Sequence, residues 1–387
     1  MMPTFYEFFA GGGMARAGLG GQWTCLFAND FSEMKAATYK ANWGDDHLAV
    51  GDIGGLSAEN LPDVADLAWA SFPCQDLSLA GNYAGIGEEQ DNDRTRSGTF
   101  WSFWKLIVDL GAQGRSPDLI VLENVYGILT SRNGQDFASV GSCLAKAGYR
   151  FGAMLIDAAR FVPQSRPRVF IVAVKKGLEM PTSILAEGPE PVWHPKALVR
   201  AVDGMDSEAK SSWLWLKMPL PSTEVEPLEQ IIDGSPEGVR WHSKAETEKL
   251  LSMMSSRNRL KVEEMKKHGA RIVGTIYKRT RQGEQRAELR IDGLAGCLRT
   301  PAGGSSRQLI LEVVGQRVRS RLLSARETAR LMGLPDTYKL PTSYNDAYHV
   351  TGDGIAVPAV RHLAANILEP ILALNGTSTD FLAVAAE

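Results

Sequence analysis

The sequence predicts an α/β fold with a doubly wound, mainly parallel sheet and a second, smaller and irregular domain. Three observations support this prediction. The N-terminal half alternates strand-like and helix-like segments, which is typical of a sheet with helices on both faces. The composition changes after Lys175 and Lys176, and a stretch rich in Pro, Trp and Ser begins at Pro181. The length of 387 residues suits about two domains.

The elements of the first domain follow from the spacing of apolar residues along the chain. Apolar runs predict strands at residues 5–10, 23–28, 65–72, 119–123, 152–157 and 168–174. The segments between them predict helices that end near Leu19 and that span 31–42, 100–110 and 135–147. Each strand is followed by a helix or a polar turn, as a mainly parallel sheet requires.

The second domain shows fewer regular patterns. A charged helix is expected over residues 243–268, with strands at 272–277 and 309–314. Ser324 and Glu327 have the spacing of a capping box, which predicts the start of a further helix that Gly333 ends. The last helix, at 358–374, has an apolar face and is expected to pack on the first domain. The predicted domains are 1–187 plus 346–387, which would be catalytic, and 188–345.

Composition limits the class of protein. The chain contains no unbroken apolar run long enough to span a membrane, and its N-terminus has no signal-peptide pattern, so a cytoplasmic protein is expected. The four cysteines are Cys25, Cys74, Cys143 and Cys297. They are widely separated and form no C-x-x-C pair, which argues against a zinc site or a disulfide framework. Reduced thiols and no bound metal are therefore expected.

The charge of the chain is unevenly distributed. Residues 240–330 contain 21 Lys and Arg against 9 Asp and Glu, a net charge of +12 in a chain whose total is −3. Such a basic window is typical of a site for a polyanion. A solvated helical face is the better interpretation for 244–267, where acids are interleaved. Nucleic-acid binding is the better interpretation for 271–307.

One thiol stands at the predicted end of a strand. Pro73 follows the apolar run 65–72 and ends it, because proline cannot donate a main-chain hydrogen bond, so Cys74 is expected at the C-terminal edge of the sheet. Ligands bind at that edge in open α/β sheets. On this stretch alone, a nucleophile and a buried small apolar residue are equally supported.

A glycine-rich turn follows the first predicted strand. Gly11 and Gly13 fit a dinucleotide fingerprint, but Arg16 occupies the position of its third glycine, which disfavours a pyrophosphate ligand. Asp30 ends the second strand, where an acidic side chain accepts hydrogen bonds from ribose hydroxyls. An adenosine ligand without pyrophosphate, such as S-adenosylmethionine, suits both features. A turn of glycines with a helix-capping aspartate explains either feature alone.

An ordered set of motifs makes the chain resemble the DNA (cytosine-5) methyltransferase family of bacterial or phage restriction-modification type. The motifs, in family order, are Phe9-Ala10-Gly11-Gly12-Gly13, Asp30, Gly51-Asp52-Ile53, Pro73-Cys74-Gln75, Glu123-Asn124-Val125, Gln164-x-Arg166-x-Arg168, Arg326-Glu327 and 352–357. They cover nearly all of the chain except about 185–290. The resemblance implies the Rossmann-like fold of S-adenosylmethionine-dependent methyltransferases and a target-recognition region in the small domain.

The resemblance implies a covalent mechanism on a flipped-out cytosine. Cytosine C5 is a poor nucleophile, so a thiolate must first add at C6, and Cys74 is the candidate. Glu123 would contact N3 and the exocyclic amine, and Arg168 would contact O2. Arg166 would support the site and keep Cys74 ionised. A structural ion-pair network is the alternative interpretation of Glu123, Arg166 and Arg168.

The resemblance also implies residues that bind cofactor and DNA. The cofactor S-adenosylmethionine, which leaves as S-adenosylhomocysteine, would contact Phe9, Gly11, Gly13, Asp30, Phe31, Asp52, Ile53, Phe100 and Asp353. DNA would contact Gln75, Ser78, Arg94 and Arg96 in the loop after Cys74. In the small domain it would contact Arg279, Arg281, Arg299, Thr300, Gly303, Gly304 and Arg307. These residues do not reveal a recognition sequence.

Two departures and two alternatives accompany the resemblance. Glu7 stands where the family usually has Asp, and Asp353 where it usually has Asn, so altered cofactor contacts are expected. A transfer-RNA cytosine-5 methyltransferase would share the catalytic motifs, and an inactive DNA-binding relative is the other alternative. The expected partners are double-stranded DNA and a cognate restriction or defence system. The expected state is a monomer associated with the nucleoid.

Overall fold

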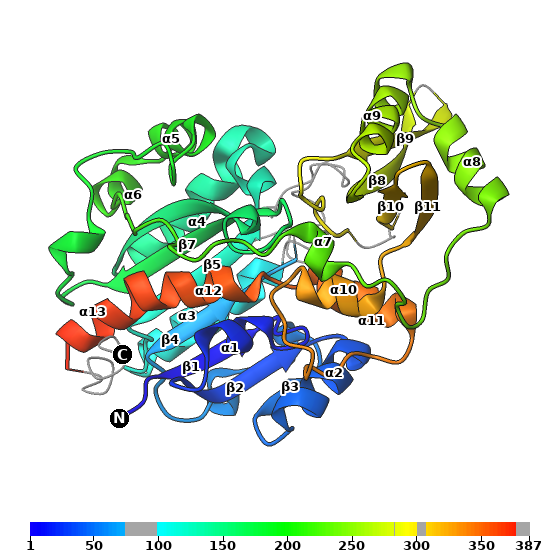
Figure 1. Ribbon diagram of the computed structural model, residues 1–387. Helices are drawn as coiled ribbons and strands as arrows, with labels where there is room; N and C mark the ends of the chain where they lie inside the picture. The colour runs from blue at the N-terminus through cyan, green and yellow to red at the C-terminus, as the bar shows by residue number, and fades with distance from the viewer. Residues whose placement is uncertain (74–98, 282, 300–306, 377–387) are drawn as a thin grey trace. The chain divides into compact units, whose positions relative to one another are not determined.

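The computed structural model describes residues 1–73, 99–281, 283–299 and 307–376 (Figure 1). The chain divides into two compact units. Unit 1 comprises Met1–Ile156, Pro167–Pro221 and Ala359–Glu387, and unit 2 comprises Asp157–Arg166 and Ser222–Pro358. The boundaries at 187 and 346 were predicted for functional domains, and they stay a prediction.

Unit 1 is built on a seven-stranded sheet in the order β3-β2-β1-β4-β5-β7-β6 (Figure 1). The strands are β1 (Thr4–Phe8), β2 (Thr24–Asp30), β3 (Leu48–Val50), β4 (Leu67–Ala70), β5 (Leu119–Val125), β6 (Tyr149–Asp157) and β7 (Pro167–Lys175). The strands from β3 to β5 pair in parallel, whereas β7 runs antiparallel to β5. The predicted doubly wound, mainly parallel sheet is therefore confirmed.

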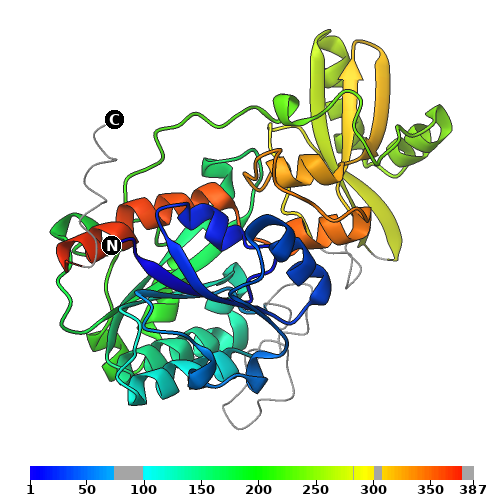
Figure 2. The ribbon, with the colours of Figure 1, turned by 90° about the horizontal axis from the view of Figure 1, so that it is seen from below.

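Helices cover the two faces of this sheet (Figure 2). One layer contains α3 (Thr99–Ala112) and α4 (Gln135–Lys146), beside which lie α5 (Lys196–Asp203) and α6 (Ser207–Ser211). The other contains α1 (Met14–Leu19), α2 (Glu33–Trp43), α12 (Val357–Leu363) and α13 (Glu369–Leu374). Residues 119–122 of β5 are all buried, as expected for a strand covered on both faces.

Unit 2 contains a four-stranded antiparallel sheet in the order β11-β10-β8-β9. Its strands are β8 (Arg271–Arg281), β9 (Glu284–Arg290), β10 (Leu309–Val314) and β11 (Arg317–Leu322). One face packs on α8 (Lys244–Ser252) and α9 (Ser256–Lys267) through a core that includes Leu250, Val262 and Leu311. The single helix expected over 243–268 is wrong: Ser255 accepts the N–H of Asn258 and starts α9 anew.

The remaining helices of the described part of unit 2 precede α8 or follow β11. They are α7 (Leu228–Ile231), α10 (Ala325–Arg330) and α11 (Tyr344–Asp353). The capping box predicted at α10 is confirmed, because Ser324 Oγ accepts the N–H of Glu327 at 3.2 Å and Glu327 Oε2 accepts the N–H of Ser324 at 2.7 Å. Short 3-10 turns lie at Ile53–Gly55, Ala58–Asn60, Tyr126–Leu129, Ser131–Gly134, Ala158–Arg160 and Thr182–Ile184, with a π-helical turn at Ala364–Leu368.

One segment has the length and hydropathy of a membrane-spanning helix. It is Tyr344–Leu374, and 56% of its most apolar window is buried. Residues 354–356 are not helical and separate α11 from α12. The burial and the non-helical break are both typical of core helices in a folded protein.

Candidate active site

Several strands of the unit 1 sheet end or begin at one common edge. β1, β2, β4 and β5 are parallel, so their C-terminal ends lie at the same edge. β7 is antiparallel to β5, so its first residues reach that edge instead of its last. The edge therefore collects the turns after Phe8, Asp30 and Ala70 together with the end of β5 and the start of β7.

An ion pair at this edge joins β5 to β7. Arg168 Nε lies 3.0 Å from Glu123 Oε1, with 13% and 10% of the two side chains exposed. Glu123 is opposite Phe170 and Arg168 is opposite Val125, so the two side chains are diagonal neighbours on one face of the pair. The structure therefore brings together two of the residues predicted to be catalytic.

The next residue along β5 holds the exit of β4. Asn124 Nδ2 donates to the main-chain O of Phe72 at 3.2 Å, and Asn124 Oδ1 accepts the N–H of Val125 at 2.8 Å. Phe72 is two residues before Cys74, which itself lies outside the described residues. The motif Glu123-Asn124-Val125 contains Asn124, but no role was predicted for this residue from the sequence. A short amide side chain next to the end of a strand could have indicated such a main-chain contact.

The chain on either side of residues 74–98 is held by aromatic packing. The ring of Phe72 contacts that of Phe100, with centroids 5.3 Å apart, and Phe100 stacks on Trp104 at 6.1 Å. Phe100 is fully buried. It therefore has a packing role in this structure, and its predicted contact with the cofactor stays a prediction.

Arg166 has different surroundings from Arg168. It belongs to unit 2, is 1% exposed, and donates to Leu298 O at 3.1 Å, Gly352 O at 2.8 Å and Gly354 O at 2.5 Å. It also donates to Cys297 Sγ at 3.3 Å. Arg166 thus joins three segments of unit 2, whereas Arg168 belongs to unit 1 and pairs with Glu123.

Gln164, the first residue of the same motif, forms a second link within unit 2. Its Nε2 donates to Leu331 O at 2.6 Å, and its Oε1 accepts the N–H of Leu298 at 3.2 Å. Asp157 Oδ1 accepts the N–H of Arg166 at 2.7 Å and so fixes the turn between Gln164 and β7. The sequence contained the motif but no sign of these long-range partners.

The glycine turn after β1 has a strained main chain that few residues tolerate. Phe9 and Gly11 both have φ near +57°, and Gly13 has φ of +77°. A Cβ on Gly13 would lie 2.3 Å from Trp43 Nε1, so only glycine fits there. Within the described part of the chain, no atom beyond the neighbouring residues lies within 4 Å of a Cβ built on Gly11, so these residues leave open space on that side of the turn.

The carboxylate of Asp30 is fixed beside this turn. Its Oδ2 accepts the N–H of Gly11 at 2.7 Å, and its Oδ1 accepts the N–H of Ser32 at 2.8 Å. Phe31, the next residue, is 76% exposed. A fixed carboxylate, an exposed ring and open space above a glycine fit the ribose and adenine of S-adenosylmethionine.

The other predicted cofactor residues are placed as follows. Asp52 is exposed and its Oδ1 accepts the N–H of Gly54 at 2.7 Å, while Ile53 is buried. These two residues follow β3 in unit 1. Asp353 is exposed at the end of α11 in unit 2.

Beneath the glycine turn lies a buried polar cluster. Glu7 is 1% exposed, its Oε1 accepts the N–H of Arg16 at 3.2 Å, and burial raises its pKa to about 8. The guanidinium of Arg16 donates to Tyr39 Oη at 3.0 Å and stacks 5.0 Å from the ring of Trp43. Burial also raises the pKa of the Cys25 thiol to about 12. Arg16, which stands where the dinucleotide fingerprint has its third glycine, is thus part of this buried cluster.

The basic residues of unit 2 include a two-stranded ribbon. Within the described residues, β8 pairs with β10 only as far as Ile276, and residues 277–281 continue paired with β9 alone. Arg279 is exposed, lies 3.4 Å from Glu288 and faces Arg286 across the ribbon. Arg299 is exposed, and Arg307 donates to Asn345 and stacks 5.5 Å from the ring of Tyr344.

Several predicted site residues lie outside the described part of the chain. They are Cys74, Gln75, Ser78, Arg94, Arg96, Thr300, Gly303 and Gly304, and the side chain of Arg281. Their predicted roles stay predictions. Among the described residues, no group of three or more His, Cys, Asp or Glu side chains has the arrangement of a metal site.

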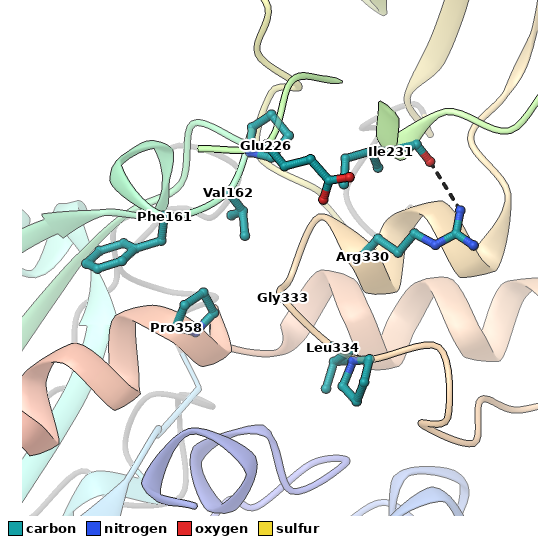
Figure 3. Close-up of a pocket in the computed structure, with 10 residues that line it drawn as sticks. Phe161, Val162, Glu226, Ile231, Arg330, Gly333, Leu334 and Pro358 are labelled. Carbon is teal, nitrogen blue, oxygen red and sulfur yellow. Dashed lines mark hydrogen bonds between the residues drawn. The ribbon is translucent and has the colours of Figure 1, made fainter. Parts of the chain in front are cut away.

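One pocket of about 350 Å³ lies within unit 2 (Figure 3). Its lining includes Phe161, Val162, Leu334 and Pro358, together with Arg330, which donates to Ile231 O at 3.4 Å. The lining is mostly apolar and includes none of the predicted site residues. Sequence reasoning assigned no function to these positions.

The fold and the edge described above are those expected of the class of S-adenosylmethionine-dependent methyltransferases. The family model described as C-5 cytosine-specific DNA methylase matches residues 3–369, and the chain belongs to this family. The protein is therefore an S-adenosylmethionine-dependent DNA (cytosine-5) methyltransferase.

Similar proteins agree with this assignment. The chain is 26% identical over 375 residues to the Type II methyltransferase M.BsuFI of Bacillus subtilis, covering 95% of this chain and 73% of the relative. It is 26% identical over 388 residues to the Type II methyltransferase M.HpaII of Haemophilus parainfluenzae, covering 95% and 90%. The solved structure of the methyltransferase EhMeth of Entamoeba histolytica has the same fold, with a TM-score of 0.62, 13% identity and coverage of 98% and 99%.

Proposed function

We propose that the protein methylates C5 of a cytosine that has left the stack of duplex DNA, with Cys74 as the nucleophile at C6. The observation that supports this most is the Glu123–Arg168 pair at 3.0 Å, on the edge where β4 ends at Ala70, four residues before Cys74 in the sequence. An acid and a cation held together at that edge match the charges that develop on a cytosine attacked at C6.

The chain's own residues divide the chemistry among them. The Cys74 thiolate adds to C6, and electron density moves toward N3 and O2 of the ring. Glu123 holds N3 and the exocyclic amine, and Arg168 holds O2. S-adenosylmethionine, when bound, supplies the methyl group that is added at C5. Loss of the C5 proton to a water-linked base then re-forms the double bond and expels Cys74.

The proposed role of Arg166 is to support the site. Its guanidinium donates to main-chain oxygens at Leu298, Gly352 and Gly354, so it fixes the segment that leads into β7 and Arg168. A direct effect on the ionisation of Cys74 stays a prediction, because Cys74 lies outside the described residues.

Most of the proposed cofactor residues belong to unit 1 and include the glycine turn. Asp30 accepts from ribose hydroxyls, Phe31 stacks on the adenine, and Asp52 and Ile53 contact the adenine edge. Phe9, Gly11 and Gly13 form the turn itself, and Phe100 and Asp353 complete the predicted set. The fixed carboxylate of Asp30 and the exposed ring of Phe31 support this assignment.

The proposed DNA contacts combine the segment after Cys74 with unit 2. The first group is Gln75, Ser78, Arg94 and Arg96, and the second is Arg279, Arg281, Arg299, Thr300, Gly303, Gly304 and Arg307. A two-stranded ribbon such as residues 277–288 has the width that a major groove admits. Each phosphate contact adds about 0.9 to the salt slope of DNA binding, so raising salt should weaken binding steeply.

Trapping of a covalent adduct tests the mechanism. Bisulfite sequencing of plasmid from an expressing host first identifies the methylated site. A duplex with 5-fluorocytosine at that site, incubated with S-adenosylmethionine, should retain the protein covalently, because fluorine at C5 leaves no proton to remove. Cys74→Ser should abolish the adduct, whereas the matched Cys143→Ser, on α4, should retain it.

The substrate class has its own test. Methyl transfer is measured to duplex DNA and to transfer RNA under the same conditions. Labelling of DNA is expected, and labelling of transfer RNA alone would overturn the proposal in favour of the RNA-acting alternative. Binding of DNA without any methyl transfer would favour the inactive relative.

The proposed biological setting is a restriction-modification or defence system in a prokaryotic cytoplasm. The Type II names of M.BsuFI and M.HpaII support it. We propose that the protein acts as a monomer associated with the nucleoid. Light scattering of the purified protein, with and without DNA, tests the monomer.

A further inference from the structure

Tyr277 lies on β8 at the point where the ribbon leaves the four-stranded sheet. Ile276 is opposite Leu309, so Tyr277 is next to Gln308, the residue that precedes β10. The Tyr277 hydroxyl donates to the main-chain O of Cys297 and lies 3.2 Å from Gln308 Oε1. These two partners flank the predicted recognition segment 299–307.

Both flanks of that segment are held further by buried polar side chains. On the entry side, Leu298 donates its N–H to Gln164 and accepts from Arg166 through its O. On the exit side, the N–H of Gln308 donates to Tyr348 Oη at 3.1 Å. Gln164, Arg166 and Gln308 are each at most 1% exposed, so water does not compete for these bonds.

The ring of Tyr277 is also tightly fitted. A Cβ on Gly296 would lie 2.2 Å from Cε2 and 2.7 Å from Oη of the tyrosine, so glycine is required for the ring to take this position. Arg279, a predicted DNA contact, has its guanidinium 5.8 Å from the centre of the same ring. Tyr277 therefore contacts both flanks of the recognition segment and the ribbon.

We infer that Tyr277 is a positioning residue for target recognition, whose hydroxyl fixes Cys297 and Gln308 and thereby the two flanks of residues 299–307. The inference rests on the proposed function, because it assigns base recognition to that segment. It also joins recognition to Arg166, since the same flank accepts the guanidinium of that arginine. Tyr277 does not contact the reacting base in this scheme, so it acts on DNA affinity and discrimination rather than on the chemical step.

The test is Tyr277→Phe, which removes only the hydroxyl. Methyl transfer is measured on a duplex with the site identified by bisulfite sequencing, and on duplexes with one base pair of that site changed. Loss of one buried hydrogen bond predicts a rise in the KM for DNA of about fivefold and a similar loss of discrimination. The kcat at saturating DNA and the affinity for S-adenosylhomocysteine should stay unchanged.

Two further variants separate positioning from general stability. Gly296→Ala should displace the ring and give the same split between KM and kcat. Tyr149→Phe is the matched control, because Tyr149 is 1% exposed in unit 1 and its hydroxyl donates to Pro117 O at 2.7 Å. It should lower thermal stability by a similar amount and leave KM and discrimination as in the wild type.

The outcomes distinguish this inference from the proposed function. An active wild type whose Tyr277→Phe variant keeps its KM and discrimination would overturn the inference alone. A fall in kcat without a change in KM, or an equal effect of Tyr149→Phe, would overturn it too. A wild type that transfers no methyl group to DNA would overturn the proposed function, and the inference with it.

Discussion

Glu123 and Glu327 are both glutamates buried against an arginine, and they lie in different units of the chain. In unit 2, Glu327 and Arg321 are fully buried, 2.6 Å apart, and Glu327 also accepts the N–H groups of Asp233 and Ser324. In unit 1, Glu123 meets Arg168 at 3.0 Å, at a strand edge where about a tenth of each side chain is exposed. In the first pair, both carboxylate oxygens of Glu327 have hydrogen-bond donors. In the second pair, part of each side chain is exposed and can contact a ligand.

This difference shows how an ion pair that stability explains can be separated from one that is proposed to be catalytic. A buried pair costs desolvation free energy that only a full set of hydrogen bonds offsets. Glu327 has that set, including the capping box of α10, so its position is explained by stability alone. Among the described residues, the side chain of Glu123 pairs with Arg168 alone, and the proposed catalytic role would account for its place at the edge.

The largest effect is expected from Glu123→Gln. The amide cannot share a proton with N3 of cytosine, so kcat/KM for methyl transfer should fall by about 10³-fold. The free energy of unfolding should fall by about 1.5 kcal/mol, less than in the corresponding Glu327 variant, because one charge-assisted hydrogen bond is weakened and about a tenth of each side chain is exposed. Single-turnover transfer and urea unfolding measure the two quantities. A destabilised variant with wild-type activity would show that the pair is structural.

The reverse pattern is expected from Glu327→Gln. Removing the charge leaves Arg321 uncompensated in the core of unit 2, and the free energy of unfolding should fall by roughly 3 kcal/mol. Urea unfolding measures this loss. At low temperature, methyl transfer per folded molecule should match that of the wild type. A loss of methyl transfer by the folded variant would mean that Glu327, like Glu123, affects activity.

Glu7 sharpens the comparison as a third buried carboxyl, which forms no ion pair with any of the described residues and accepts the main-chain N–H of Arg16. Burial and Asp30 raise its pKa, whereas Arg16 and Tyr39 lower it, and the result is a value of about 8. The folded protein therefore holds a proton between pH 4.5 and 8 that the unfolded chain releases. Its contribution to stability is full below pH 4.5 and is lost as pH rises toward 8.

Glu7→Gln should remove this pH dependence. Relative to the variant, the wild type should lose about 1.4 kcal/mol of unfolding free energy per pH unit between pH 5 and 8. Thermal unfolding of both proteins across that range measures the difference. Parallel pH profiles would mean that Glu7 is ionised in the folded protein.

The smallest effect is expected from Asn124→Ala. The variant loses the hydrogen bond to Phe72 O, so the free energy of unfolding should fall by about 1 kcal/mol. Formation of the 5-fluorocytosine adduct should slow, because the exit of β4 toward Cys74 is held less firmly. Adduct yield against time measures this. An adduct rate equal to that of the wild type would limit the role of Asn124 to packing.

The sequence predicted unit 1 well because its motifs lie at strand ends. Apolar runs marked every strand but the short β3, and parallel pairing then brought Asp30, Phe72 and Glu123 to one edge. The resemblance, and not this logic, placed Glu123 and Arg168 in one site, because the first residues of β7 reach that edge only through antiparallel pairing with β5. The role of Asn124 was missed because it depends on a contact with the main chain of another strand.

Unit 2 was predicted less completely because its contacts join distant residues. Tyr277 touches Cys297 and Gln308, and Gln164 bonds to Leu331, and no local pattern indicates such pairs. β9 was missed because most of its residues are charged or polar, and β11 because three arginines occupy alternate positions and leave only Val318 and Leu322 as apolar residues. The capping box at Ser324 was predicted because that signal is local.

The contact between Phe72 and Phe100 has a consequence for how this chain tolerates insertions. The two rings hold Phe72 and Phe100 together, so their contact closes a loop of chain between them whatever path that chain takes. The entropy of closing such a loop grows only with the logarithm of its length, at about 0.6 kcal/mol per doubling. Residues can therefore be added to or removed from this loop at little thermodynamic cost, while the sheet edge from which it departs keeps its geometry.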